Sequence, residues 1–233
     1  MELDELLGSV SLRIHSAGWP FIAVAAGVSV ALALFSGPLG ILGAISTLWL
    51  TYFFRDPERV TPVRDGLVVS PADGRVQMIT HAAPPRELGM GERAVPRVSI
   101  FLNIFDVHVN RIPADGAVRA VDYRPGKFFN AALDKASEDN ERMSVRLAVA
   151  DGRELAFVQI AGLIARRISC DLKLGDVVRA GTRYGIIRFG SRLDVYLPEG
   201  AAPLVVVGQR AIGGETVLAD LGSPEPARQG EVR

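Results

Sequence analysis

Cysteine, histidine and net charge are all scarce in this chain of 233 residues, and each scarcity excludes a class of protein. The single cysteine, Cys170, excludes an intrachain disulfide framework and any zinc or iron–sulfur site built from several thiolates. The three histidines, His15, His81 and His108, lie far apart without metal-ligand spacing, so we predict no metal site. Lys and Arg together number 26, as do Asp and Glu, so the chain lacks the basic field that attracts nucleic acid.

The sequence also lacks the motifs of several common enzyme classes. No G-x-G-x-x-G follows a predicted strand, and there is no P-loop, no G-x-S-x-G and no H-E-x-x-H. Dinucleotide binding, nucleotide hydrolysis, esterase activity and zinc-dependent proteolysis therefore have no support.

Charged residues are absent from Ile14 to Phe54, a run of 41 residues that is about twice the length of one membrane span. Gly37-Pro38 interrupts the run, since proline cannot continue a helix and glycine commonly ends one. We predict two apolar helices, 18–36 and 39–54, of roughly 28 and 24 Å. The first just crosses a hydrocarbon core of about 30 Å, whereas the second is short unless the bilayer thins or the hairpin only dips into it.

The flanks of this hairpin favour membrane attachment over secretion. Residues 1–12 carry acidic side chains instead of the positive n-region of a signal peptide. Arg13, Arg55, Arg59 and Arg64 flank the hairpin on one side, which by the positive-inside rule predicts a cytoplasmic body. A buried helical hairpin in a soluble core is the alternative.

After Pro57 the sequence changes to short β-branched runs separated by turn residues, the pattern of many short strands. A short helical turn is expected within 130–141, and the predicted strands are 66–70, 74–79, 97–102, 116–123, 143–150, 155–160, 183–189, 193–197 and 203–207. This spacing predicts a mainly β fold, a compact β-sandwich or barrel-sandwich-like body with an N-terminal hydrophobic helical hairpin. The predicted parts are the membrane-associated hairpin, the β-rich domain and a flexible tail, at 1–56, 57–220 and 221–233.

Four polar motifs occur within these apolar strands or at their turns. They are Val69-Ser-Pro-Ala-Asp73-Gly74, Phe101-Leu-Asn-Ile-Phe-Asp-Val-His108-Val-Asn-Arg111-Ile-Pro113, Gly126-Lys127-Phe-Phe-Asn130 with 135–142, and Arg188-Phe-Gly190-Ser191-Arg192-Leu-Asp194. In this order, behind an apolar hairpin, they resemble phosphatidylserine decarboxylase, in particular its short membrane-associated bacterial form. The resemblance covers nearly the whole chain.

This resemblance implies a self-processing proenzyme that cuts itself between Gly190 and Ser191. The products would be a 190-residue β chain and a 43-residue α chain that form a heterodimer. Ser191 would become a covalent pyruvoyl group, the cofactor, whose carbonyl binds the substrate amine and accepts electrons as CO₂ leaves. The Ser191 hydroxyl must attack the Gly190 carbonyl, which requires a base and donors for the oxyanion. A glycine leaves room for that approach.

The resemblance also assigns roles to residues that would otherwise be ordinary. Ser191 and Asp73 are by default turn residues, and His108 is by default a half-buried strand histidine. The family makes Asp73 the acid that orients a histidine for self-cleavage, and His108 the base in processing and the proton donor after CO₂ loss. Longer members carry two histidines three apart before the proline, whereas the second position here is Arg111. Arginine cannot act as a base at neutral pH, so His108 is expected to serve both steps.

Basic residues in the same motifs are candidates for the lipid phosphate and carboxylate, because guanidinium binds both in a fork. They are Arg111, Lys127, Arg142, Arg188 and Arg192. The expected reaction converts phosphatidylserine to phosphatidylethanolamine at the cytoplasmic face of a bacterial inner membrane, with a membrane phospholipid as the partner and a higher oligomer left open. The alternatives are a decarboxylase of a related seryl lipid and a non-catalytic, membrane-tethered β-sandwich that binds lipid.

Overall fold

The computed structural model describes residues 13–126, 140–162, 168–188 and 191–231. The chain divides into two compact units, Met1–Glu58 and Arg59–Arg233. The first unit is helical and the second is built of strands.

The N-terminal unit is the predicted hairpin. After the short 3₁₀ turn η1 (Ser16–Gly18), α2 runs over Trp19–Phe35 and α3 over Gly37–Phe53, so Ser36 alone separates them. The helices approach closely at small residues, because a Cβ on Gly40 would collide with Ala33. The hydroxyls of Ser29 and Thr47 lie 3.0 Å apart between the helices. Close small-residue contacts with internally satisfied hydroxyls are typical of helix pairs in lipid.

The outer surface of this hairpin is apolar. Ser16–Phe35 forms 20 helical residues with a mean hydropathy of 2.0, long and apolar enough to cross a membrane, and Gly37–Phe53 is a shorter apolar helix. Large exposed side chains cover both helices, among them Val24, Leu34, Phe35, Ile41, Leu42, Ile45 and Leu48. This composition favours membrane association.

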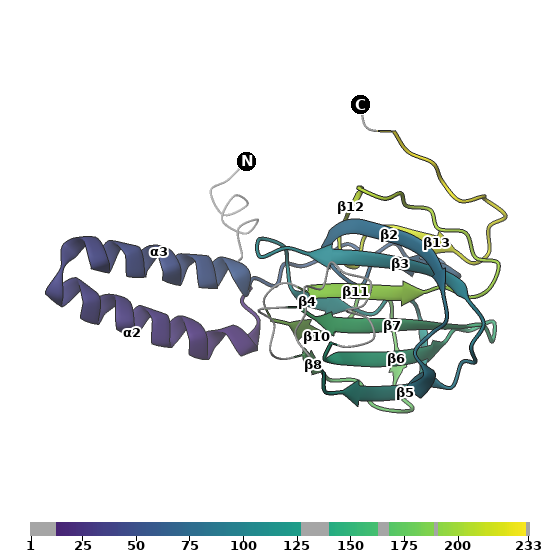
Figure 1. Cartoon of the computed structure of the whole chain (residues 1–233), viewed down its shortest axis with the longest axis horizontal. Coiled ribbons are helices and arrows are strands. Elements are labelled where there is room, and N and C mark those ends of the chain that lie inside the picture. The colour runs from purple at the N-terminus through teal and green to yellow at the C-terminus, as the bar shows by residue number, and fades with distance from the viewer. Residues whose placement is uncertain (1–12, 127–139, 163–167, 189–190, 232–233) are drawn as a thin grey trace. The chain divides into compact units, whose positions relative to one another are not determined.

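The second unit is an antiparallel β structure (Figure 1). Eight strands form one sheet in the order β12-β2-β3-β11-β7-β6-β5-β9, three form a second in the order β4-β10-β8, and β1 pairs with β13. The strands are β1 (Leu67–Val69), β2 (Gly74–Ala82), β3 (Val95–Leu102), β4 (Val109–Arg111), β5 (Gly116–Arg124), β6 (Arg142–Ala148), β7 (Glu154–Ala161), β8 (Ile168–Cys170), β9 (Val177–Val178), β10 (Arg183–Ile187), β11 (Ser191–Tyr196), β12 (Arg210–Ala211) and β13 (Val217–Asp220).

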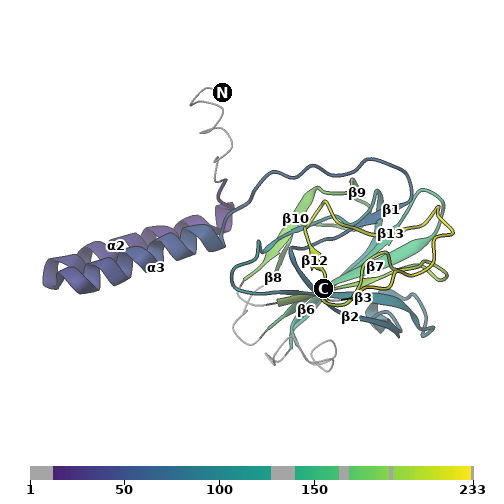
Figure 2. The same ribbon diagram turned by 90° about the horizontal axis from the view of Figure 1, so that it is seen from above.

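The large sheet is covered on both faces. In Figure 2, β2, β3 and β6 lie on one side of the body, and β1, β10 and β13 on the other. Alternate residues of the central strands, such as Ile100 on β3 and Leu193 on β11, pack between the sheets in the main core. A smaller cluster on the outer face includes Ile160, Tyr196 and Leu88, the last from the 3₁₀ turn η2 (Arg86–Leu88). The predicted mainly β fold with an N-terminal helical hairpin is confirmed.

Several details differ from the sequence prediction. Residues 203–207 form no strand, because this apolar run is buried as a loop with a single bridge from Pro203 to Ala219. The short strands β4, β8, β9, β12 and β13 were not predicted, since two to four residues carry too little periodicity. Most of the helical turn expected at 130–141 lies outside the described residues. In the predicted tail, the Arg228 backbone N–H donates to the Pro203 carbonyl over 3.2 Å.

Candidate active site

Ser191 is the first residue of β11, in the middle of the large sheet (Figure 1). It pairs with Leu102 at the end of β3 and with Ala161 at the end of β7. The side chain is fully buried, and its Oγ has no hydrogen-bond partner among the described residues. Gly190 and Lys127, two further predicted site residues, lie outside the described residues.

His108 lies at the same end of the large sheet as Ser191. The chain leaves β3 at Leu102, turns through 103–107 and reaches His108 immediately before β4. The Ile187 backbone N–H donates to the His108 carbonyl over 3.2 Å. Since Ile187 precedes Ser191 by four residues, their Cα atoms are at most about 14 Å apart. The segment that carries His108 therefore begins at Leu102, the register partner of Ser191 at this end of the large sheet.

The alternation of side chains turns His108 toward the large sheet. His108 lies one residue before β4, and residues two apart in an extended segment point the same way, so we expect it to share the face of Asn110. Asn110 Oδ1 accepts a hydrogen bond from Gln159 Nε2 over 2.8 Å. Gln159 and Ala161 lie on the inner face of β7, opposite Leu193 and Ser191 respectively. Asn110 and Ser191 thus face the same interior space, and His108 is expected to face it too.

The hydrogen bonding of His108 defines its neutral tautomer. Nδ1 lies 3.0 Å from the Asp106 carbonyl oxygen, which can accept but cannot donate a hydrogen bond. A neutral His108 therefore carries its proton on Nδ1 and a lone pair on the buried Nε2. This is the form that a general base requires.

Asn110 contributes a buried donor in the same space. Gln159 Nε2 lies 3.5 Å from the Ser169 carbonyl, which can only accept, so the amide nitrogen of Gln159 must face both Ser169 and Asn110. That contact fixes Oδ1 of Asn110 on Gln159 and leaves Nδ2 without a hydrogen-bond partner among the described residues. A fully buried amide N–H with no partner is costly, so this group is a candidate donor to a bound or reacting species.

Asp73 lies at the turn that begins β2, and its carboxylate is already engaged. Arg59 Nη2 donates to Oδ2 over 2.7 Å, and the Gly213 backbone N–H donates to Oδ1 over 2.8 Å. No hydrogen bond joins Asp73 to His108 within the described part of the chain. Burial raises the pKa of Asp73, while the Arg59 charge opposes the rise and the Asp106 charge adds to it. Asp73 is thus an electrostatic neighbour of the segment that carries His108.

The predicted basic residues take up different positions. Arg192 lies on the opposite face of β11 from Ser191 and is fully buried, with Nε and Nη2 each 2.9 Å from a carboxylate oxygen of Asp194. Arg111 lies on the opposite face of β4 from His108, and its Nη1 donates to the Gly181 carbonyl over 2.8 Å. Arg188 is half-buried three residues before Ser191.

Arg142, a further basic residue of these motifs, is nearly buried on the outer face of the large sheet. Its Nε donates to Glu87 over 2.8 Å, and Ser144 also donates to the same carboxylate. This contact joins η2 to β6.

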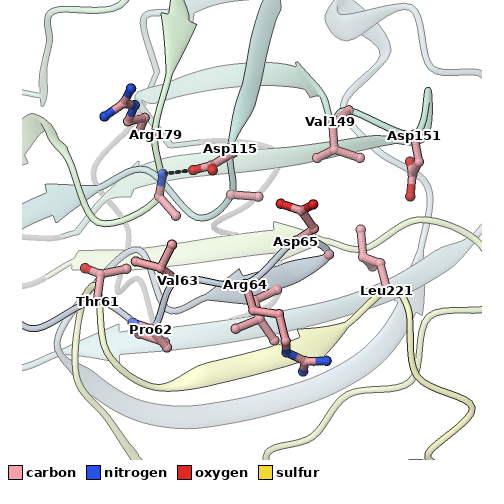
Figure 3. Close-up of a pocket in the computed structure, with 15 residues that line it drawn as sticks. Thr61, Pro62, Val63, Arg64, Asp65, Asp115, Val149, Asp151, Arg179 and Leu221 are labelled. Carbon is pink, nitrogen blue, oxygen red and sulfur yellow. Dashed lines mark hydrogen bonds between the residues drawn. The ribbon is translucent and has the colours of Figure 1, made fainter.

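A cavity of about 650 Å³ is lined by other residues (Figure 3). Thr61, Asp65, Asp115 and Leu221 are among them, and the Ala180 backbone N–H donates to Asp115. The predicted site residues are absent from its lining. This cavity is therefore separate from the predicted site residues.

Sequence reasoning overlooked several neighbours of the site. Asp106 and Asn110 stand in the motif around His108, so their nearness in sequence could have suggested them. Gln159 and Arg59 lie far along the chain from their partners Asn110 and Asp73, and nothing in the local pattern marks them.

Comparison with known proteins gives one consistent result. Residues 47–219 match the sequence model of the phosphatidylserine decarboxylase family. A phosphatidylserine decarboxylase proenzyme of Paramagnetospirillum magneticum is 63% identical over 220 residues, covering 94% of this chain and 92% of the relative. The proenzyme of Cereibacter sphaeroides is 57% identical over 98% of this chain and 99% of its own length. That of Rickettsia africae is 61% identical over 90% of both chains.

Proposed function

Because the chain belongs to the phosphatidylserine decarboxylase family, we propose that it makes its own pyruvoyl group by cutting the bond between Gly190 and Ser191. The protein is a carboxy-lyase that converts phosphatidylserine to phosphatidylethanolamine and CO₂. The relatives are named proenzymes, which implies a precursor that is cleaved into chains. Cleavage here would give a β chain of residues 1–190 and an α chain of residues 191–233, held together as a heterodimer.

The main support for this proposal is the buried hydroxyl of Ser191. Its Oγ makes no hydrogen bond to a described residue, so no existing bond must break before it attacks the preceding carbonyl. A pyruvoyl group at position 191 would supply a carbonyl that condenses with the substrate amine and accepts electrons as CO₂ leaves. The fit rests on position 191 being fully buried between β3 and β7, where water is excluded.

His108 is the proposed base and acid. With Nδ1 held by the Asp106 carbonyl, Nε2 is the nitrogen that takes the proton from the Ser191 hydroxyl. The same nitrogen, once protonated, would return a proton to the substrate carbon that loses CO₂. One histidine then serves both steps, as Arg111 at the second histidine position of longer family members requires.

Asn110 is the proposed donor for the oxyanion. The attack places negative charge on the carbonyl oxygen of the scissile bond, and a fixed N–H in a dry site stabilises such a charge strongly. The Nδ2 group of Asn110 is buried on the face it shares with His108, and its orientation is set by Gln159.

Asp73 is proposed to position His108 indirectly. Its carboxylate is bonded to Arg59 and Gly213 and influences Asp106, whose carbonyl holds the His108 ring. Asp73 would thus orient the histidine, as the resemblance implies, without a hydrogen bond between the two side chains.

Arg188 and Lys127 are the proposed ligands of the substrate phosphate and carboxylate. Arg188 precedes Ser191 by three residues, and Lys127 follows Gly126 at the start of the third motif. Arg111 and Arg192 were predicted for the same role, but their hydrogen bonds to Gly181 and Asp194 assign them to holding strands in place.

The apolar hairpin is proposed to attach the enzyme to the cytoplasmic face of the bacterial inner membrane. Arg13 and Arg55 at the open end of the hairpin support this orientation, as does Arg55 stacked 3.7 Å over the ring of Tyr52. Attachment would hold the enzyme at the bilayer, where its lipid substrate lies.

Intact-mass spectrometry of the protein purified from membranes tests the cleavage. We expect two chains that divide at Gly190/Ser191, the smaller carrying a pyruvoyl mass at its blocked N-terminus. Ser191→Ala should leave one chain of 233 residues and no decarboxylation. Ser99→Ala is the matched control, because Ser99 is also a buried strand serine whose Oγ lacks a hydrogen-bond partner among the described residues. An uncut wild-type chain, or equal effects of both variants, would refute the proposal.

A further inference from the structure

The segment between β3 and His108 is a tightly bonded turn. The Asp106 backbone N–H donates to the Asn103 carbonyl over 3.0 Å, and the Asn103 N–H donates to Asp106 Oδ2 over 2.8 Å. The Phe105 N–H donates to Asn103 Oδ1 over 2.7 Å. Three hydrogen bonds within four residues fix the direction in which the tip of this turn points.

The fixed tip presents two apolar side chains to the outside. Ile104 is 38% exposed and Phe105 is 57% exposed, while the following residues 106–108 are buried. Two neighbouring apolar side chains that a rigid turn holds at the surface form a patch that can bind an apolar partner.

Two arginines stand beside this turn. Arg75 on β2 and Arg210 on β12 are register partners and both are exposed, and Arg75 is also the register partner of Phe101 near the end of β3. Arg210 Nη2 donates to Asp106 Oδ1 over 2.6 Å, which ties it to the turn. Arg75 has no charged partner within the described part of the chain. Like charges directly opposite each other on a sheet are unfavourable, and Asp106 offsets the charge of Arg210 alone, so a further anion would stabilise the pair.

We propose that the turn 103–107 and the pair Arg75–Arg210, together called the docking turn, bind the surface of an anionic phospholipid bilayer. Ile104 and Phe105 enter the acyl region, and the arginines contact lipid phosphates. This combination of a few apolar side chains with cations is how proteins bind a membrane interface. The inference rests on the proposed function, because the docking turn leads directly into His108 and would deliver a lipid from the bilayer to it.

Depth-dependent quenching tests the docking turn without any turnover. Phe105→Trp is placed in a Trp19→Phe/Trp49→Phe background, which removes both native tryptophans. The full chain is then reconstituted into phosphatidylglycerol vesicles with and without brominated acyl chains. We expect brominated lipid to quench the fluorescence of the introduced indole at least twofold.

Leu174→Trp in the same background is the control for this experiment, since Leu174 is an exposed apolar residue on a different turn. Its indole should keep its fluorescence when brominated lipid is present. Equal quenching of the two variants, or no quenching of the Phe105→Trp variant, would overturn the proposal.

A second experiment separates the membrane surface from the substrate head group. For Arg75→Gln, kcat/KM is compared for phosphatidylserine in phosphatidylglycerol vesicles and for a short-chain monomeric phosphatidylserine. The vesicle-to-monomer ratio should fall about tenfold. Arg119→Gln, which changes an exposed arginine on β5, should leave the ratio unchanged. Equal losses on both substrates would mean that Arg75 binds the head group and not the bilayer, which contradicts the proposal.

The two experiments distinguish this inference from the assignment of the catalytic residues. Quenching requires only a folded chain in vesicles, so it remains informative if the roles of His108 and Ser191 prove wrong. Activity that survives in Phe105→Trp while its introduced indole stays unquenched would refute the docking turn alone.

Discussion

At the scale of single residues, the site depends on hydrogen bonds that fix which atom faces the reaction. The Asp106 carbonyl selects the tautomer of His108, and Gln159 selects the orientation of the Asn110 amide. The carbonyls of Asp106 and Ser169 can only accept, so the first sets the tautomer of His108 and the second sets the amide of Gln159, which in turn orients Asn110. The proposed reactive atoms are Nε2 of His108 and Nδ2 of Asn110. They are identified by the hydrogen bonds of the supporting groups and not by a distance to a substrate.

Removing the amide of Asn110 should slow self-cleavage without unfolding the body. For Asn110→Ala we expect a rate of chain cleavage about 100- to 1000-fold lower, the usual cost of losing one oxyanion donor. The time course of cleavage on a denaturing gel, after synthesis in the presence of vesicles, measures this rate.

Asn140→Ala is the matched control for that experiment. Asn140 is also a buried asparagine, but its Nδ2 already donates to the Ala161 carbonyl over 2.7 Å. Its loss should lower stability and leave the cleavage rate within a few-fold. Similar slowing by both variants would assign Asn110 a structural role.

The sequence could predict part of this site. The motif around Gly190–Ser191 and His108 carries the family resemblance, so those residues were identifiable. The face on which Arg192 lies depends on the register of β11 against β3, which no local pattern reveals. The contact between Asn110 and Gln159 depends on packing of two sheets and joins residues 49 positions apart.

At the scale of elements, the region after β2 holds the outer face of the large sheet through Glu87. This carboxylate accepts hydrogen bonds from Arg142 and Ser144 on β6, and its side chain is 3% exposed. Burial opposes ionisation of Glu87, but the bonds and charges of Arg142 and Arg124 outweigh it and hold its pKa below the usual value. Glu87 therefore links η2 to β6 through Arg142 and Ser144, and to β5 through Arg124.

Glu87→Gln should destabilise the protein most at neutral pH. Breaking a buried ion pair from one side costs about 3 kcal/mol, because Arg142 is left without its partner. Since folding lowers the pKa of Glu87, its contribution is present above the usual glutamate value of 4.5 and is lost as the pH falls through the lower folded value. Urea unfolding in detergent at pH 7 and pH 4 should show a difference between wild type and variant that shrinks at the lower pH.

Glu92→Gln provides the comparison on the same segment. Glu92 pairs with Arg86 at the surface and its side chain is 77% exposed, so its loss should cost less than about 1 kcal/mol at either pH. A penalty for Glu87→Gln that is equally small, or that does not change with pH, would contradict the assigned role of Glu87.

Long elements were predictable from the sequence and short ones were not. The hairpin followed from 41 uncharged residues with one break, and strands such as β3 and β7 followed from their β-branched runs. The apolar run 203–207 was wrongly predicted as a strand, because burial alone does not distinguish a packed loop from a paired strand.

At the scale of the whole molecule, cleavage before Ser191 would divide the sheets between two chains. Residues 191–233 supply β11, β12 and β13, and the strands with which these three pair, namely β3, β7, β2 and β1, belong to residues 1–190. Leu193 and Val195 are fully buried in the main core. The smaller chain is therefore built into the body, whereas the apolar hairpin belongs wholly to the larger chain.

This division of strands and hairpin predicts which of the two chains each wash removes from the membrane. After cleavage, a high-salt wash should leave both chains in the membrane pellet, because the α chain is held by three strands and a shared apolar core. Concentrated urea should release the α chain alone, since it opens the sheets that hold this chain and unfolds the surface that carries Arg210, while the hairpin keeps the β chain in lipid. In Ser191→Ala, the uncut chain should stay in the pellet through both washes, which gel electrophoresis of pellet and supernatant would show. Release of the α chain by salt would mean that its contacts with the β chain are peripheral, and retention of both chains in urea would mean that the α chain has its own membrane attachment.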